Sequence, residues 1–305
     1  MRVTFLGTAA SRPTVTRNVS SLTIAREGEL LMFDCGEGTQ RQMMRYGTGF
    51  SLNDIFFTHM HADHFLGVIG LLRTLGLQAR EEPIHLWAPA GGRAILRDAV
   101  HLGVERVNFE VHIHEIAPED PIARDGYDIV PFRATHGPSA VGYALIEHER
   151  LGRFNPDRAR ELGVPEGPLF GQLHRGQAVE VEGRVIHPSE VVGEKRPGRR
   201  VVYTGDTRPS KHTIRYAQDA DLLVHDATFG EDEAERARET GHSTAREAAN
   251  VARQARALRL ALTHISSRYA EDSRILEREA RDVFGASFVA YDGQQIEIPF
   301  RDAKP

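Results

Sequence analysis

The sequence predicts an α/β protein in which two β-sheets pack together and helices cover both outer faces. Short apolar strands alternate with helix-like segments over most of the 305 residues, which is the pattern of layered α/β folds. Four residues of metal-binding types, His and Asp, come at or just after the ends of predicted strands, at His59, His136, Asp206 and His264. Because side chains at strand ends meet along one edge of a sheet layer, we expect a single functional site at that edge.

The first half of the chain is mainly strand. A predicted strand at Arg2–Gly7 is followed by two more, and the four residues 25–28 between them have the composition of a hairpin turn. The other strands of this half are expected at Ser21–Ala25, Leu30–Cys35, Asp54–Thr58, Ile84–Pro89, Asn108–Ile116, Ile129–Thr135 and Gly142–Ile146. Its helices are expected at Gly38–Tyr46, Leu66–Leu77 and Arg93–Leu102.

The second half alternates strand and helix more plainly. Its strands are expected at Arg200–Tyr203, Leu222–His225, Leu260–Thr263, Ser287–Tyr291 and Gln295–Phe300. Its helices are expected at Lys211–Asp219, Ser243–Leu258 and Ser273–Phe284. Ser243 is a candidate N-cap, since its hydroxyl can accept a hydrogen bond from the first helical turn, where Glu247 also lies.

The segment 149–199 does not follow this alternation. It is rich in Gly, Pro, Arg and Glu and has few sustained apolar patterns. Such a composition is typical of a disordered loop. It also suits an arm that protrudes from the fold and has a function of its own, and the residues alone leave both readings open.

Composition excludes some classes of protein. No apolar run is long enough to span a bilayer, and the first residues lack a basic segment followed by an apolar one, so we expect a cytoplasmic protein without a membrane segment. The net charge of -5 does not favour nucleic-acid binding over the whole surface, although local clusters of Lys and Arg can still bind phosphates. The single cysteine, Cys35, allows no intrachain disulfide and is expected to be a packed residue.

The strongest signal is a cluster of three histidines and an aspartate that follows an apolar strand, at His59, His61, Asp63 and His64. In an extended segment, alternate side chains point the same way, so His59 and His61 can share one metal ion. A turn after His61 would direct Asp63 and His64 toward a second ion. Imidazole and carboxylate ligands suit Zn²⁺, and they also suit Mn²⁺ or Fe.

A pair of metal ions needs further ligands, one of which bridges both. His136, Asp206 and His264 are candidates, because each follows a predicted strand. Each alone would more often be a structural residue, but together with the histidine cluster they predict a binuclear centre. Two close metal ions lower the pKa of a water between them and stabilise charge on phosphate oxygens, which suits phosphodiester hydrolysis. Asp63 is expected to orient the attacking water or accept its proton.

These residues together resemble the metallo-β-lactamase superfamily. The resemblance implies an αββα sandwich and two Zn²⁺ ions per subunit, with Mn²⁺ as an alternative. It assigns the first metal to His59, His61 and His136, the second to Asp63, His64 and His264, and the bridging position to Asp206.

Within this superfamily, the whole chain resembles the ribonuclease Z family. The segments that carry this resemblance are 13–18, 33–40, 225–229, 241–244 and 163–176. The resemblance implies that His242 protonates the leaving 3′ oxygen, steered by Asp226, which stands where the family usually has Glu. The expected substrate-binding residues are Arg17 in the first segment and, at the tip of a tRNA-binding arm, Gly167, Pro168, Gly171 and Gly176.

The resemblance also implies the organisation and the activity of the protein. We expect a single metallo-β-lactamase-like domain over residues 1–305, with residues 149–199 inserted as the tRNA-binding arm. The expected activity is that of a zinc-dependent endoribonuclease, which removes the 3′ trailer from precursor tRNA by metal-hydroxide attack and leaves a 3′-hydroxyl on the tRNA. The expected assembly is a homodimer, in which the arm of one subunit holds the tRNA while the other subunit cuts.

Two other functions remain open. A general phosphodiesterase or exoribonuclease could use the same metal centre. An RNA-binding module with a vestigial metal site belongs to a different class, and the presence of every expected ligand argues against it.

Overall fold

The structure is a computed structural model that describes residues 1–104 and 107–301. Its contacts divide the chain into two compact units. The first unit comprises Met1–Leu145 and Arg200–Ile298, and the second comprises Ile146–Arg199 and Pro299–Pro305. None of the helices in the described part of the chain has the length and apolar character required to cross a membrane.

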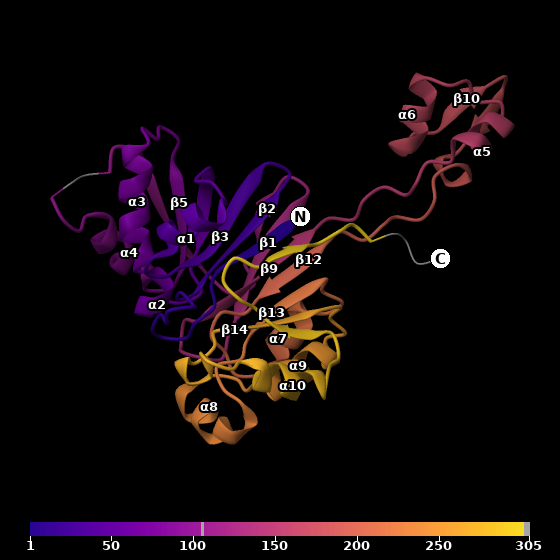
Figure 1. The fold of residues 1–305 in the computed structure, drawn as a ribbon. Coiled ribbons are helices and arrows are strands. Elements are labelled where there is room, and N and C mark those ends of the chain that lie inside the picture. Colours follow the sequence, from indigo (N-terminus) through magenta and orange to yellow (C-terminus); the bar gives the residue numbers. More distant parts are fainter. Residues whose placement is uncertain (105–106, 302–305) are drawn as a thin grey trace. The chain divides into compact units, whose positions relative to one another are not determined.

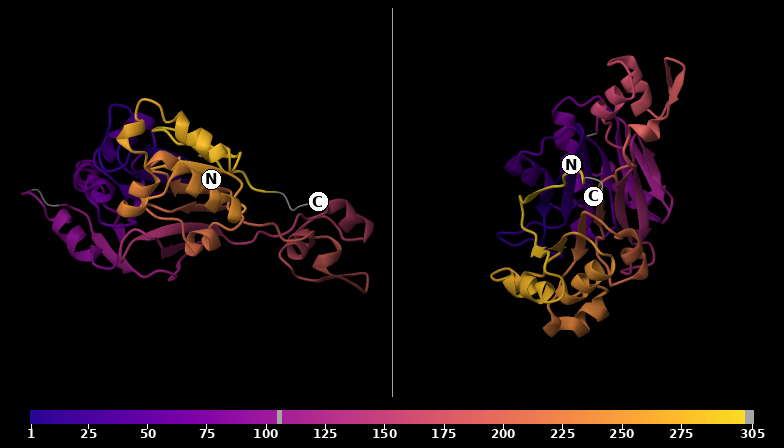
Figure 2. Two further views of the ribbon diagram at one scale, coloured as in Figure 1. Left: turned by 90° about the horizontal axis from the view of Figure 1, so that it is seen from below. Right: turned by 90° about the vertical axis from the view of Figure 1, so that its right-hand side faces the viewer.

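The first unit contains two seven-stranded sheets with helices on their outer faces (Figures 1 and 2). The first sheet has the order β16 (Gln295–Glu297), β1 (Arg2–Gly7), β2 (Ser21–Arg26), β3 (Glu29–Cys35), β4 (Leu52–Phe56), β5 (Ile84–Pro89) and β6 (Val111–Ile116). The second has the order β15 (Ser287–Val289), β14 (Leu260–Thr263), β13 (Leu222–Asp226), β12 (Arg200–Tyr203), β9 (Val141–Glu147), β8 (Tyr127–Arg133) and β7 (Ile122–Arg124). The predicted αββα sandwich is confirmed.

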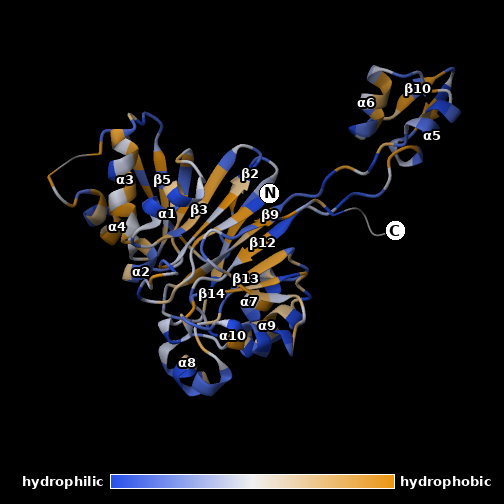
Figure 3. Ribbon diagram, in the orientation of Figure 1, coloured by the Kyte–Doolittle hydropathy of each residue, from blue (hydrophilic) through white to orange (hydrophobic). Residues whose placement is uncertain are grey.

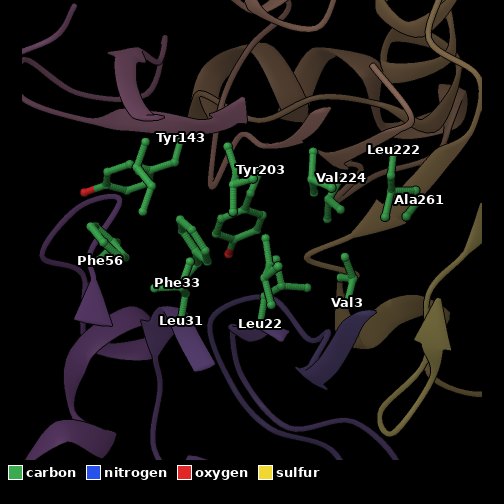
Figure 4. Close-up of a cluster of buried hydrophobic side chains, with 14 of the residues drawn as sticks. Val3, Leu22, Leu31, Phe33, Phe56, Tyr143, Tyr203, Leu222, Val224 and Ala261 are labelled. Atoms are coloured by element: carbon green, nitrogen blue, oxygen red, sulfur yellow. The ribbon is translucent and has the colours of Figure 1, made fainter. Parts of the chain in front are cut away.

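Aromatic side chains fill the space between the two sheets. Phe33 of β3 and Phe56 of β4 stack with ring centroids 5.1 Å apart. Tyr143 of β9 meets both rings edge-on, at 5.6 Å, and Figure 4 shows Tyr203 of β12 beside them. Edge-to-face and offset contacts of this kind add to the stabilisation from apolar burial. Figure 3 shows that these strands are rich in apolar residues. Their side chains form the core between the sheets, and this core holds the strand ends and the adjoining loops in place.

Helices cover the outer face of each sheet. The helices that follow strands of the first sheet are α1 (Thr39–Tyr46), α2 (Ala62–Phe65), α3 (Gly67–Leu77) and α4 (Gly92–Val100). Those in the second half are α7 (Lys211–Tyr216), α8 (Ala234–Thr240), α9 (Ala245–Gln254) and α10 (Arg274–Arg281), with short 3₁₀ turns η2 (Glu231–Glu233) and η3 (Ser267–Tyr269). Met43, Leu71 and Leu96 are buried against the first sheet, while α9 packs on β13, β14 and α10.

Two local predictions have different outcomes. The hairpin turn is confirmed, because Arg26 pairs with Glu29 and the two residues between them, Glu27 and Gly28, have φ values of 48° and 95°. Such positive φ values at both positions suit a tight hairpin. The prediction that Ser243 caps its helix is wrong. Thr244 is the N-cap and forms a capping box with Glu247, whereas Ser243 donates its hydroxyl to the Thr207 carbonyl, 2.6 Å away.

The second unit has secondary structure and a small core of its own. It contains α5 (Pro156–Glu161), α6 (Pro168–His174), the hairpin strands β10 (Val179–Val181) and β11 (Arg184–Ile186), and the turn η1 (Pro188–Glu190). Its buried apolar side chains are Ala159, Val164, Leu173, Val179, Ile186 and Val191. A disordered loop over this segment is therefore excluded.

A buried ion pair ties together the two ends of the segment. The Glu147 carboxylate accepts hydrogen bonds from Arg199 at Nε (2.8 Å) and at Nη2 (2.7 Å). The Arg199 guanidinium also lies 3.8 Å from the centre of the Phe300 ring. A bidentate, buried pair fixes both backbones in register.

The glycine and proline residues expected at the tip of the arm lie in and around α6. Gly167 is its N-cap, Pro168 occupies its first turn, and Gly171 lies inside it. Gly176 follows the helix with a φ of 88°. Leu173 of the same helix is buried in the small core, and this burial holds the segment helical.

Candidate metal centre

The chain delivers the predicted ligands to the ends of strands. His59 and His61 follow β4, and His61 stands at the N-cap of α2, which carries Asp63 and His64. The remaining candidates follow strands of the second sheet, with His136 after β8, Asp206 after β12 and His264 after β14. His264 has a φ of 59°, an unusual conformation for a residue other than glycine and one that often marks a functional position.

The structure brings all seven predicted ligands together in two groups. One group is His59, His61, His136 and Asp206, and the other is Asp63, His64 and His264. Within each group, one nitrogen or oxygen atom of every member lies within 4.8 Å of those of the others.

Asp206 lies between the two groups. Its Oδ1 atom is 3.3 Å from Nε2 of both His64 and His264. Its Oδ2 atom is 3.6 Å from Nε2 of His59 and 3.8 Å from Nε2 of His136. Each carboxylate oxygen therefore faces a different group, which is the arrangement required of a bridging ligand.

Four of the histidines use one ring nitrogen, Nδ1, for a contact with a neighbouring group of the protein. The anchoring contacts are His59 to the Thr58 hydroxyl (3.0 Å), His64 to Asp34 (2.7 Å), His136 to the Gly241 carbonyl (3.0 Å) and His264 to the Thr228 hydroxyl (2.8 Å). Contacts of this kind orient metal-binding imidazoles and fix their tautomer. They leave Nε2 of each ring as the nitrogen that faces the centre.

Asp34 is a supporting residue that the sequence analysis missed. It is fully buried, with a φ of 54°. Besides its contact with His64, its carboxylate accepts hydrogen bonds from the Thr58 amide at 2.8 Å and from the Tyr203 hydroxyl at 2.9 Å. The available signal was an acidic residue inside the otherwise apolar strand 30–35, since buried carboxylates need partners.

Unpartnered buried atoms indicate that this cluster fits a cation. Nε2 of His59, Nε2 of His64 and Oδ1 of Asp206 are buried and have no hydrogen-bond partner among the described residues. Buried polar atoms are rarely left unpaired, and exceptions need an explanation. These unpaired lone-pair donors belong to both ligand groups, and metal ions bound at the two groups would explain them.

The protonation states set by the protein alone are largely those that a metal ion needs. Burial, followed by the positive potential of His64, lowers the pKa of His59 well below its usual value. Burial would raise the pKa of Asp206, but His264 and His64 outweigh it and hold that pKa well below normal. Burial would lower the pKa of His64, but Asp206 and Asp34 raise it well above normal. A cation that binds here therefore displaces a proton from His64.

His242 and Asp226 form a pair beside the ligands. His242 Nδ1 lies 2.9 Å from Asp226 Oδ2, so the shorter side chain of Asp still reaches the histidine. Asp226 also accepts hydrogen bonds from the amides of Thr207 (3.0 Å) and Thr228 (2.9 Å). Burial would lower the pKa of His242, but the charge and the hydrogen bond of Asp226 outweigh it and raise that pKa to about 9.

Asp63 lies at a cavity of about 360 Å³. Its Oδ2 atom accepts a hydrogen bond from the Ser11 amide at 2.8 Å and lies 3.3 Å from His264 Nε2. Burial would raise the pKa of Asp63, but the hydrogen bond with His264 and the potential of His64 lower it below normal. The same cavity is lined by His61, His136, Asp206 and His242 and, around them, by Arg12, Phe229, Arg236, Ser267 and Arg268.

Arg17 is the residue of the N-terminal loop that is expected to bind substrate. Its guanidinium is nearly buried and donates hydrogen bonds to the Thr8 hydroxyl (2.7 Å), the Ala290 carbonyl (2.5 Å) and the Ser273 hydroxyl (3.1 Å). These contacts indicate that Arg17 fixes its loop, and contact with substrate stays a prediction. Gly167, Pro168, Gly171 and Gly176 belong to the second unit, and their contact with RNA likewise stays a prediction.

The prediction that Cys35 is a packed residue is confirmed. The side chain is fully buried, and burial raises the pKa of its thiol to about 12. A thiol that stays protonated and inaccessible is a poor nucleophile.

Comparison with known proteins gives a consistent result. The model of the metallo-beta-lactamase superfamily matches residues 14–264. Ribonuclease Z of Gemmatimonas aurantiaca is 57% identical over 299 residues, which cover 97% of this chain and 95% of the relative. Ribonuclease Z of Myxococcus xanthus is 55% identical over 304 residues, which cover 99% of this chain and 99% of the relative. The crystal structure of the short form of human tRNase Z matches 98% of this chain and 100% of its own, with a TM-score of 0.72 and 28% identity.

Proposed function

The chain belongs to the ribonuclease Z family of the metallo-β-lactamase superfamily, and on this premise we propose that its histidine and aspartate cluster holds two zinc ions that serve RNA hydrolysis. It is an endoribonuclease of tRNA 3′ processing, which removes the 3′ trailer and leaves a 3′-hydroxyl on the tRNA. The observation that carries the proposed metal centre is the position of Asp206, whose two oxygens face two separate groups of oriented imidazoles.

The two groups of candidate ligands suggest how two ions would be held. His59, His61 and His136 would hold the first ion, Asp63, His64 and His264 would hold the second, and Asp206 would be shared by both. Asp226 is left out of the ligand set, although it lies within reach. Its carboxylate is already occupied by hydrogen bonds from Thr207, Thr228 and His242.

The protein side chains supply the proton transfers. When bound, two zinc ions lower the pKa of a water between them and stabilise charge on the attacked phosphate. Asp63, held by the Ser11 amide, accepts the proton of the attacking water. His242 gives a proton to the leaving 3′ oxygen, and Asp226 keeps the imidazole protonated and oriented. Positioned groups of this kind typically contribute about 10²–10⁴-fold in rate.

The test of this function is the incubation of the purified chain with a precursor tRNA that carries a 3′ trailer, with mapping of the products. We expect one cut at the 3′ side of the tRNA, an intact released trailer, and loss of cleavage after chelation. A ladder of shortened trailers would indicate an exoribonuclease instead. Binding of the precursor without cleavage, in the presence of zinc, would indicate an RNA-binding module.

Four further features are part of the proposal. We infer that Zn²⁺ is the native ion, with Mn²⁺ as the alternative, and that the protein acts in the cytoplasm as a homodimer. In the dimer, the second unit of one subunit holds the tRNA while the other subunit cuts. Residues 146–199 of the second unit contain nine acidic and nine basic residues, and several of these are paired, as in Arg158–Glu161 and Arg160–Glu166. This balance favours recognition through shape and backbone over charge.

A further inference from the structure

Three arginines line the cavity at the candidate metal centre, and they differ in what their guanidinium groups contact. Arg12 donates two hydrogen bonds to the Ser267 hydroxyl, at 3.2 and 3.1 Å. Arg268 donates to the Glu233 carboxylate at 2.9 Å. Arg236, on α8, is exposed and has no carboxylate partner among the described residues. Arg12 also lacks a carboxylate partner in the described part of the chain, but its guanidinium is held by Ser267. Among the described residues, Arg236 is therefore the cavity arginine whose guanidinium makes no hydrogen bond or ion pair.

Phe229 places Arg236 on the same side of the cavity as His242. The Arg236 guanidinium carbon lies 6.0 Å from the centre of the Phe229 ring. That ring lies 6.2 Å from the ring of His242. Because Phe229 is buried, it is a fixed spacer between the proton donor and the cation.

We propose that Arg236 binds the RNA phosphate on the 5′ side of the last nucleotide that the tRNA retains. This inference rests on the proposed function, in which His242 protonates the 3′ oxygen of that nucleotide. The retained strand therefore leaves the cut on the His242 side of the cavity, and its next phosphate comes to Arg236. A planar guanidinium can bind two phosphate oxygens at once, which favours this partner over a base.

Arg238 provides a matched control on the same helix. It is also exposed, but it lies two residues further along α8 and is not among the residues that line the cavity. Two residues correspond to more than half a turn of helix, so the two side chains leave α8 in different directions. Replacement of either residue by alanine removes the same charge.

The first test compares Arg236→Ala and Arg238→Ala on precursor tRNA under single-turnover conditions. We expect kcat/KM to fall about tenfold for Arg236→Ala, as for the loss of one charge-assisted hydrogen bond. The slope of log(kcat/KM) against log[salt] should decrease by about 0.7, as for one phosphate contact on a single strand. Arg238→Ala should leave both quantities unchanged. Equal effects of the two substitutions would overturn the proposal.

The second test locates the phosphate. A methylphosphonate at the linkage 5′ of the last retained nucleotide should slow the wild-type protein about tenfold and have no further effect on Arg236→Ala. The same modification one linkage into the trailer should slow both proteins equally. An unchanged penalty at the first linkage in Arg236→Ala would overturn the assignment.

A small phosphodiester separates this inference from the proposed function. Bis(p-nitrophenyl) phosphate has no neighbouring phosphate, so wild type and Arg236→Ala should hydrolyse it at the same rate. A reduced rate in Arg236→Ala would contradict a role limited to the neighbouring phosphate. Failure of the wild-type protein to cut precursor tRNA would instead contradict the proposed function itself.

Discussion

Nδ1 of His242 lies 2.9 Å from Oδ2 of Asp226, at the side of the two ligand groups. Because Asp226 also accepts hydrogen bonds from the amides of Thr207 and Thr228, its carboxylate is fixed and His242 donates to it. The histidine is thus held with one nitrogen committed and Nε2 free for proton transfer. Asp in place of the Glu that is usual in the family still reaches the histidine.

Substitution of this pair should separate chemistry from binding. We expect His242→Ala to lower kcat by about 100-fold or more, since a positioned general acid contributes that much, with little change in KM. Asp226→Asn keeps the shape but removes the charge, so its loss of kcat should be smaller. Single-turnover cleavage of precursor tRNA measures both effects. Zinc content, measured by mass spectrometry, should stay at the wild-type value, and loss of zinc from His242→Ala would show that this residue is a ligand.

The Asp34–His64 contact should control metal affinity. Asp34→Asn preserves side-chain size and tolerates the positive φ of this position, but it removes the charge that faces His64 Nδ1. We expect zinc affinity to fall about 10–100-fold, as for other residues that orient metal-binding histidines. Competition with a chromophoric chelator measures this. Tyr203→Phe removes only one hydrogen bond to Asp34 and should have a smaller effect; equal effects would contradict the assigned role.

The second unit can be removed at a defined place. Phe154 and Val192 form an antiparallel bridge, so a two-residue Asn-Gly turn can replace residues 155–191. The variant keeps the buried pair of Glu147 and Arg199. We expect it to hydrolyse bis(p-nitrophenyl) phosphate at the wild-type rate while cleavage of precursor tRNA falls at least tenfold. Equal loss of both activities would contradict a role for this unit in RNA binding.

Subunit mixing tests the proposed dimer. The variant without residues 155–191 has an intact metal centre, and His64→Ala has an intact second unit. If one subunit holds the tRNA and its partner cuts, a mixture of these two impaired proteins should cleave precursor tRNA faster than either protein alone. Size-exclusion chromatography with light scattering provides the control for mixed dimers. Mixed dimers without restored cleavage would show that each subunit works alone.

The metal ligands could be predicted from the sequence because their signal is local. His59, His61, Asp63 and His64 fall within six positions, and the spacing itself indicates shared ligation. The orienting residues could not be predicted in this way. Asp34 contacts a histidine 30 residues away and Thr228 one 36 residues away. These contacts arise only when β3 pairs with β4 and β13 pairs with β14, so they depend on tertiary structure. Most strands and helices of the first unit could be predicted because apolar periodicity is also a local property, whereas β7 and α8 were missed.

The small unit was harder to predict for a related reason. Its core consists of a few apolar side chains spread over residues 159–191, without the regular spacing of a long amphipathic helix. Gly171 has a low helix propensity, but burial of Leu173 holds the same segment helical. Tertiary burial here outweighs the local preference of glycine, whereas a proline in the first turn, as at Pro168, favours the start of a helix.

Labelling of the Cys35 thiol tests whether this residue is buried in the folded protein. Because burial raises the pKa of its thiol to about 12, the thiol stays protonated at pH 8 and is also shielded from solvent. We expect no reaction with a disulfide reagent such as DTNB in the native protein, and one thiol per chain after unfolding in guanidinium chloride. Rapid labelling of the native protein at pH 8 would contradict the burial of this residue.

The binuclear metal centre is tested most directly by titrating zinc into metal-free protein while the cleavage of precursor tRNA is followed. We expect no cleavage without metal and a cleavage rate that reaches its maximum at two zinc ions per chain. In His264→Ala, which loses a ligand of the second group, the maximum should be far lower and should need excess zinc. Full cleavage by the metal-free protein, or an unchanged titration in His264→Ala, would contradict the binuclear centre.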